Sequence, residues 1–361
     1  MRKRTRRTAL LLSALLMLGL AGCGAPEAES SAPATTAPTT TTTTTTKPTT
    51  TTTTAPPLGY NVFTGVHDLT SDSNRPVAVV VSDETSKMTQ LGLESADFYF
   101  EAETEGGIPR ILAVYASPDR LPEAIGPVRS ARPHFVKIVH ALDAVYCHIG
   151  GSRSGKQAIR DLGVEDLQNA FIIHDVLKNS SNFSWNRSAF TRKKITADMK
   201  RYGYATTSDL RSPFVFGEKT GDRAAGTVDV KISESYNIAF TFNEETGLYE
   251  KHRNSLDTPI HHTYTGGPIA VSNVLVLFDR RTVDQVEQTA NGGTMTRYNF
   301  DLESGHGLMA SGGTARPIKW EFTKTGMVFY EQDGTTPLTV ATGKTFLCLA
   351  SKTLENKTKT Y

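Results

Sequence analysis

The chain has 361 residues, with 39 Lys and Arg against 37 Asp and Glu, and three cysteines. Residues 1–22 contain five of the basic residues and no acidic one, which leaves 34 basic against 37 acidic residues and a net charge of −3. A near-neutral body lacks the large basic field of nucleic-acid-binding proteins. Three cysteines do not indicate a disulfide framework, and Cys147 and Cys348, each in an apolar, strand-like run, are expected to be buried free thiols.

The N-terminus has a basic tip and a short apolar run that ends at Leu20-Ala21-Gly22-Cys23. The apolar run is too short to span a bilayer and predicts a signal peptide over residues 1–22. Two small residues before a cysteine, with an aliphatic residue before them, resemble the bacterial lipoprotein signal. This resemblance implies that Cys23 is lipidated and anchors the protein to the outer face of the cell membrane, in an envelope of the Gram-positive type.

Residues 23–57 form a low-complexity segment, in which sixteen of the twenty positions from Thr35 to Thr54 are Thr. Such a segment has almost no apolar surface to bury and cannot offset its ordering entropy. We expect a disordered Thr- and Pro-rich tether between the lipid and a folded body.

The first part of the body, residues 58–225, alternates β-rich and helical runs and predicts an α/β domain. The expected strands are residues 77–81, 98–102, 108–116 and 144–149, and the expected helices begin near Phe135 and cover 154–162 and 188–202.

Residues 226–361 are almost wholly β in pattern, with alternation at residues 228–232 and 238–242 and frequent Gly turns. Further strands are expected over residues 269–278, 283–288, 294–300, 318–322, 327–330 and 345–350. We predict a smaller antiparallel β domain, either a sandwich or a partly open barrel, so the fold class is α+β overall.

Several short motifs span the body: Arg75-Pro76-Val77-Ala78-Val79, Ser95-Ala96-Asp97, Gly126-Pro127-Val128-Arg129-Ser130-Ala131-Arg132-Pro133, His148-Ile149-Gly150-Gly151-Ser152, Gly305-His306-Gly307 and Gly343-Lys344-Thr345-Phe346. In these motifs the chain resembles the YerB-like bacterial lipoproteins, a family of two-domain envelope proteins classed as a domain of unknown function. The resemblance covers most of residues 74–350. The resemblance implies a location in the cell envelope and a two-domain organisation, but no activity.

Basic side chains and a glycine turn suggest an anion site. Arg129 and Arg132 are three residues apart at the start of a predicted helix, and guanidinium groups bind carboxylate or phosphate at two points. The turn Gly150-Gly151-Ser152 precedes another helix, whose N-terminus favours an anion. We predict that these residues, with Arg110, bind an anionic group such as a peptide carboxylate or a wall-polymer phosphate.

The alternative is that Arg129 and Arg132 form internal ion pairs that fasten the helix to the sheet. The acidic residues available for such pairs are Glu101, Glu103, Glu105 and Asp97.

The stretch from Gly150 to Gln157 is close to a phosphate-binding loop, but Gln157 occupies the position of the required Ser or Thr. We therefore expect no nucleotide and no cofactor. The expected partners are the membrane, through Cys23, and a cell-wall polymer or other envelope proteins.

The second functional hypothesis is an envelope hydrolase or transferase. Glu101, Glu103 and Glu105 alternate on a predicted strand and would share one face. Glu101, Glu105 and His148 are the candidates for acid/base catalysis. The sequence contains no His or Cys pair at metal-ligand spacing, so no metal site is predicted. A binding or assembly protein remains the preferred function, and a purely structural spacer is a third possibility.

Overall fold

The computed structural model describes residues 59–361 except 72–73, 85–88, 169, 179–183, 219, 253, 289–291 and 324–325. The described residues belong to a single compact unit. The predicted signal peptide, the lipidated Cys23 and the predicted tether lie outside them. Within the described ranges, no helix is both long enough and apolar enough to cross a membrane.

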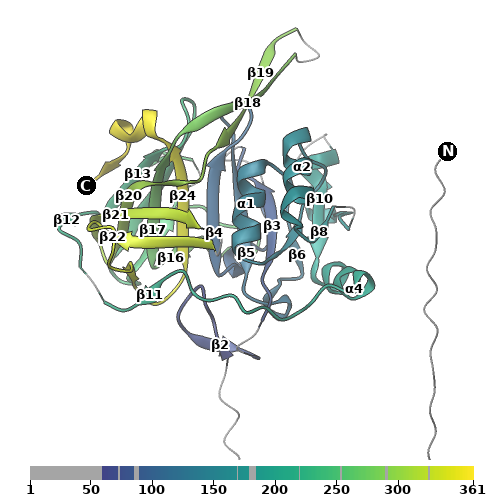
Figure 1. Cartoon of the computed structure of the whole chain (residues 1–361), viewed down its shortest axis with the longest axis horizontal. Coiled ribbons are helices and arrows are strands. Elements are labelled where there is room, and N and C mark those ends of the chain that lie inside the picture. Colours follow the sequence, from purple (N-terminus) through teal and green to yellow (C-terminus); the bar gives the residue numbers. More distant parts are fainter. Residues whose placement is uncertain are drawn as a thin grey trace, which may run out of the picture. The chain divides into compact units, whose positions relative to one another are not determined.

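A central mixed sheet of eleven strands forms the middle of the body (Figure 1). Its order is β12-β21-β20-β17-β24-β4-β5-β3-β7-β8, with β22 added beside β21. The strands are β3 (Val77–Ser82), β4 (Phe98–Glu103), β5 (Pro109–Tyr115), β7 (Val145–Cys147), β8 (Asp166–Leu167), β12 (Arg223–Ala224), β17 (Asn273–Asp279), β20 (Ser304–Ser311), β21 (Thr314–Thr323), β22 (Gly326–Glu331) and β24 (Thr345–Ser351).

Strands from both halves of the sequence join in this sheet. β24 pairs in parallel with β4, with Phe346 opposite Tyr99. The presence of helices and strands together confirms a mixed fold. The division into two domains near residue 225 stays a prediction.

The two faces of the central sheet carry separate hydrophobic cores. Along β3, Val77, Val79 and Val81 join a core that includes Val228 of the second sheet. The intervening Ala78 and Val80 join the core that includes Phe135 of α1 (Pro133–Ala141). Strands buried on both faces have nearly continuous apolar sequences, which explains the run at β3. The body therefore has three layers, in which α1 and α2 (Arg153–Leu162) cover one face of the central sheet, and the second sheet with α4 (Arg192–Tyr202) covers the other.

The helices are α1 (Pro133–Ala141), α2 (Arg153–Leu162), α3 (Asp175–Lys178) and α4 (Arg192–Tyr202), with 3-10 turns η1 (Leu93–Ser95), η2 (Pro118–Arg120), η3 (Ser184–Arg187) and η4 (Lys352–Lys357). The second sheet has the order β16 (Ala270–Val271), β15 (Leu248–Lys251), β14 (Asn237–Asn243), β13 (Thr227–Lys231) and β25 (Lys359–Thr360).

Smaller sheets complete the body. They are β1 (Gly59–Tyr60) with β2 (His67–Leu69), β6 (Ala124–Ile125) with β10 (Ser188–Thr191) and β9 (Ile172–Ile173), and β11 (Val215–Phe216) with β23 (Thr339–Val340). The hairpin of β18 (Arg281–Gln288) and β19 (Thr294–Phe300) projects beyond the layers (Figure 1).

One predicted helix begins later than expected. Residues 188–191 form β10, which pairs with both β6 and β9, and α4 starts only at Arg192. The Thr191 hydroxyl accepts a hydrogen bond from the Lys194 amide at 3.2 Å and caps the helix. Pairing with two distant strands, which the local sequence does not encode, overrides the helical pattern at residues 188–191.

Candidate functional site

The segment from Gly126 to Arg132 runs along one end of the central sheet and positions two of the predicted arginines. The Arg129 amide donates to the Val80 carbonyl at 2.8 Å, and the Ile149 amide donates to the Arg129 carbonyl at 3.0 Å. These bonds hold the segment across the carboxyl ends of the parallel strands β3 and β7. Ligand sites of α/β sheets commonly lie at such ends.

The structure brings Arg110 and Arg132 together at one carboxylate. Arg132 Nε donates to Glu105 Oε2 at 2.8 Å, and Arg110 forms an ion pair with the same carboxyl group. Burial alone would raise the pKa of Glu105, but the charges of Arg110 and Arg132 outweigh burial and lower it to about 2. Glu105 is therefore ionised at neutral pH and offsets one of the two positive charges.

Arg129 contacts a different acidic residue. Its Nη2 lies 3.3 Å from Glu84 Oε2 and also donates to Asn186 Oδ1. The Arg129 side chain is 9% exposed, whereas that of Glu84 is 37% exposed. Burial, followed by the charges of Arg132 and Arg129, lowers the pKa of Arg110 to about 9, so the arginines are close enough to repel one another.

The predicted glycine turn lies beside these arginines. The Ala131 amide donates to the Gly150 carbonyl, and the Ser152 amide donates to the Ala131 carbonyl. Gly150 has a φ of 61°, a value that favours glycine. The Ser152 hydroxyl accepts from the Gly155 amide at 3.0 Å and caps α2. We call Arg110, Arg129, Arg132 and Gly150–Ser152 the arginine site.

A buried hydroxyl adjoins the arginine site. The Tyr146 side chain is fully buried, and its hydroxyl has no hydrogen-bond partner among the described residues. Burial raises the pKa of Tyr146, and the nearby charges of Arg110 and Arg132 act in the opposite direction.

The candidate catalytic residues have three different sets of partners. Glu105 binds arginines, Glu101 faces Lys251 with a closest approach of 3.7 Å, and the His148 imidazole lies between Asp166 and the Gly150 carbonyl. Glu103, on the same strand as Glu101, pairs with Arg281 at 2.7 Å. Glu101, Glu105 and His148 thus lie in separate environments rather than in one acid/base group. No cluster that could bind a metal ion occurs in the described part of the chain.

A buried charge cluster, not anticipated from the sequence, joins the two halves of the chain. Lys251 Nζ donates to Asp83 Oδ2 at 2.8 Å, and the Lys251 side chain is fully buried. Burial and the neighbouring Asp83 raise the pKa of Glu101 well above its ordinary value, whereas Lys251 and His261 hold that of Asp83 below its own despite burial. The sequence contained one indication that Lys251 is buried. Side chains alternate with period two along β15, so Lys251 lies on the same face as the buried Tyr249.

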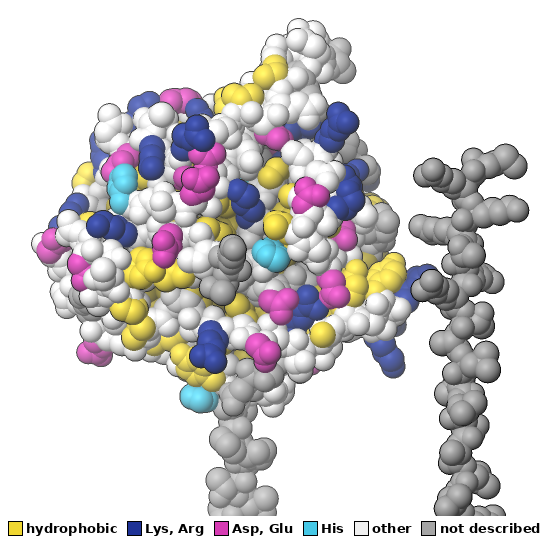
Figure 2. Space-filling view, in the orientation of Figure 1, with side chains coloured by type: hydrophobic (Ala, Val, Ile, Leu, Met, Phe, Trp, Pro, Cys, Tyr) yellow, Lys and Arg dark blue, Asp and Glu magenta, His cyan; other side chains and the backbone are white. Residues whose placement is uncertain are grey.

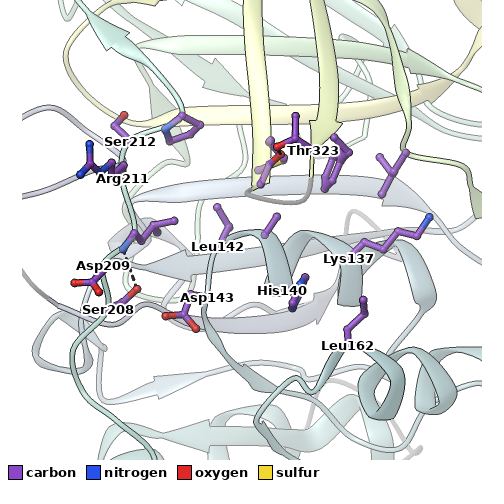
Figure 3. A pocket seen from close by; sticks show the side chains of 17 residues that line it. Lys137, His140, Leu142, Asp143, Leu162, Ser208, Asp209, Arg211, Ser212 and Thr323 are labelled. Atoms are coloured by element: carbon purple, nitrogen blue, oxygen red, sulfur yellow. Dashed lines mark hydrogen bonds between the residues drawn. The ribbon is translucent and has the colours of Figure 1, made fainter.

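A cavity of about 970 Å³ opens between the end of α1, residues 208–213 and the β21–β22 hairpin (Figure 3). Leu142, Leu302 and Met327 give it apolar walls, and Lys137 and Asp209 lie among its polar lining. Acidic and basic side chains are interspersed on the face that carries α1 and α2 (Figure 2). The cavity could accommodate an amphipathic ligand.

Comparisons with known proteins agree with the resemblance in the motifs. Residues 63–209 match the family described as "Protein of unknown function (DUF3048) N-terminal domain", and residues 228–347 match its C-terminal domain. "Putative lipoprotein YerB" of Bacillus subtilis is 28% identical over 258 residues, which are 68% of this chain and 73% of that protein. The crystal structure of Bacillus subtilis YerB is similar with a TM-score of 0.67 at 25% identity, over 81% of this chain and 96% of the other.

Proposed function

This chain belongs to the DUF3048 family of proteins of unknown function, and we propose that it is a lipid-anchored binding protein of the bacterial cell envelope that recognises an anionic ligand at the arginine site. The name of the relative from Bacillus subtilis, a putative lipoprotein, supports anchoring through Cys23. Anchoring there would hold the body outside the cell membrane, within reach of wall polymers and other envelope proteins.

The observation that carries this proposal is the surplus of buried positive charge. Within the described ranges, three guanidinium groups, on side chains each less than a tenth exposed, form ion pairs with two carboxylates, Glu105 and Glu84. An excess of buried positive over negative charge is costly unless an anion offsets it. A carboxylate or phosphate from outside would supply the missing negative charge.

Glu84 indicates where the ligand would enter. Its carboxylate is the most exposed acidic partner of the three arginines, and its 3.3 Å contact with Arg129 is the longest of their ion pairs. An incoming anion would therefore compete with Glu84 for Arg129, while Glu105 continues to hold Arg110 and Arg132 in position.

The test is sedimentation of the full-length protein with isolated cell-wall sacculi in detergent. Two sacculus preparations are needed, one native and one stripped of phosphate polymers by hydrofluoric acid, so that phosphate and peptide carboxylate are distinguished. We expect the wild-type protein to pellet, Arg129→Ala to lower the pelleted fraction at least fivefold, and Glu84→Gln to raise it because a competing carboxylate is removed.

The matched control is Arg223→Ala, which removes an exposed arginine on β12 and should leave the pelleted fraction unchanged. Each variant is checked for folding by thermal melting. The proposal fails if the wild-type protein stays in solution with both preparations. It also fails if Arg129→Ala lowers the melting temperature but pellets as the wild type does, since the arginines would then be structural.

A further inference from the structure

A second, smaller pocket lies on a different part of the body, between β2, η2 and the residue before β24. Its volume is about 450 Å³, within the range of roughly 300–1,000 Å³ typical of small-molecule sites. Apart from Leu69, every side chain that lines it is polar or charged. Two of them, Ser95 and Lys344, belong to motifs that carry the family resemblance and have no part in the arginine site.

Ser117 gives this pocket a buried hydroxyl group without a partner. The residue precedes η2 at a position where a serine hydroxyl commonly accepts a backbone N–H, but its side chain makes no capping bond. Ser117 is 1% exposed, and its Oγ has no hydrogen-bond partner among the described residues. Leaving a buried hydroxyl unsatisfied is unfavourable, and a polar ligand atom in the pocket would offset that cost.

The charges of the pocket are already balanced. Arg120 donates to Asp68 Oδ2 at 2.9 Å and lies 2.7 Å from the buried Asp97. The ammonium group of Lys344 donates to the Glu94 carbonyl at 2.6 Å, and its pKa is lowered chiefly by burial. The charged side chains that line the pocket are two cations, Arg120 and Lys344, and two carboxylates, Asp68 and Asp119, so the lining has no surplus charge that would select an anion or a cation.

Both donors and acceptors line this pocket. The Thr70 hydroxyl donates to Asp119 at 3.2 Å, and Arg120 and Lys344 add N–H groups to the lining. A hydroxyl group both donates and accepts, so a ligand with several hydroxyls can match such a surface at many points.

We propose that this pocket binds a neutral polyhydroxylated ligand the size of a hexose. Ser117 and Lys344 would contact its hydroxyl oxygens, and the exposed carboxylate of Asp119 would accept from them. The pocket is independent of the arginine site and adds sugar recognition to the proposed anion binding.

The experiment is saturation-transfer NMR of the full-length protein with D-glucose and N-acetyl-D-glucosamine at millimolar concentrations. We expect transfer to at least one sugar, no displacement by equimolar inorganic phosphate, and binding weakened about tenfold by Lys344→Met and at least threefold by Ser117→Ala. Lys359→Met removes an exposed lysine of β25 and serves as the matched control.

The absence of transfer from both sugars to the folded wild-type protein would overturn the proposal. Equal binding by Ser117→Ala and the wild type would also overturn it, and this small substitution decides the matter if Lys344→Met does not fold. Displacement of the sugar by phosphate would refute a neutral ligand. Arg129→Ala should bind sugar normally, so failure here and failure of the anion hypothesis can be told apart.

Discussion

The buried charge cluster and the arginine site use the same residue types in opposite proportions. In the cluster, the carboxylates of Asp83 and Glu101 share the ammonium group of Lys251, and all three side chains are at most 2% exposed. In the arginine site the cations outnumber the carboxylates, and Glu84 is partly open to solvent. Protonation of Glu101 can neutralise the cluster from within. The arginine site cannot lose its excess positive charge by a change of protonation, because arginine keeps its charge.

The largest effect is expected from Lys251→Met, which leaves two buried carboxyl groups without their cation. Breaking a buried ion pair by removing one partner typically costs about 3–5 kcal/mol of the free energy of unfolding. Urea unfolding at pH 7 measures this loss. Lys231→Met, which removes a partly buried lysine of β13 in the same sheet that donates to Asn237, is the control and should cost much less. A loss below about 1 kcal/mol for Lys251→Met would show that the cluster does not hold the two halves together.

The buried charge cluster and the arginine site should differ in whether a carboxylate's contribution to the free energy of unfolding rises or falls with pH. Glu105 has a folded-state pKa of about 2 against an ordinary value of 4.5, so its stabilisation is present above pH 4.5 and is lost as the pH falls towards 2. Glu105→Gln should therefore lower the free energy of unfolding by about 2–3 kcal/mol at pH 7 and by almost nothing near pH 2.

Glu101→Gln should show the opposite pH dependence of stability. The pKa of Glu101 is raised in the folded state, so its favourable contribution is present below pH 4.5 and is lost as the pH rises through the folded-state value. The variant should gain stability relative to the wild type as the pH rises, measured by urea unfolding between pH 4 and pH 8. Parallel pH profiles for Glu101→Gln and Glu105→Gln would contradict the contrast between the two regions.

Hydrophobic spacing within a single segment was enough to predict several strands and helices. The continuous apolar run at β3 and the helical spacing around Phe135 both correspond to observed elements, and the sequence also predicted that Cys147 and Cys348 are buried free thiols, which is confirmed. β20 was missed because its glycine-rich start weakens a strand pattern, and residues 188–191 were read as helix because their partners β6 and β9 are far away in sequence.

For the charged sites too, partners that are far apart in the sequence could not be predicted. The pairing of Arg132 with Glu105 was one of the two alternatives derived from the sequence, and the structure contains it. The partners of Arg129 and Lys251 were not anticipated, since Glu84 and Asp83 precede them by 45 and 168 residues. Contacts at such separations depend on how the sheets stack, which hydrophobic periodicity does not specify.

The smallest effect is expected at the exposed pair of His306 and Glu355, whose side chains are 49% and 43% exposed. His306 belongs to one of the family motifs, but an exposed histidine–carboxylate contact contributes only about 0–1 kcal/mol because water competes for both groups. Glu355→Ala should therefore change the free energy of unfolding by less than about 1 kcal/mol in urea. A larger loss would mean that charge pairs stabilise this protein regardless of burial, and the contrast drawn between its two charged regions would lose its physical basis.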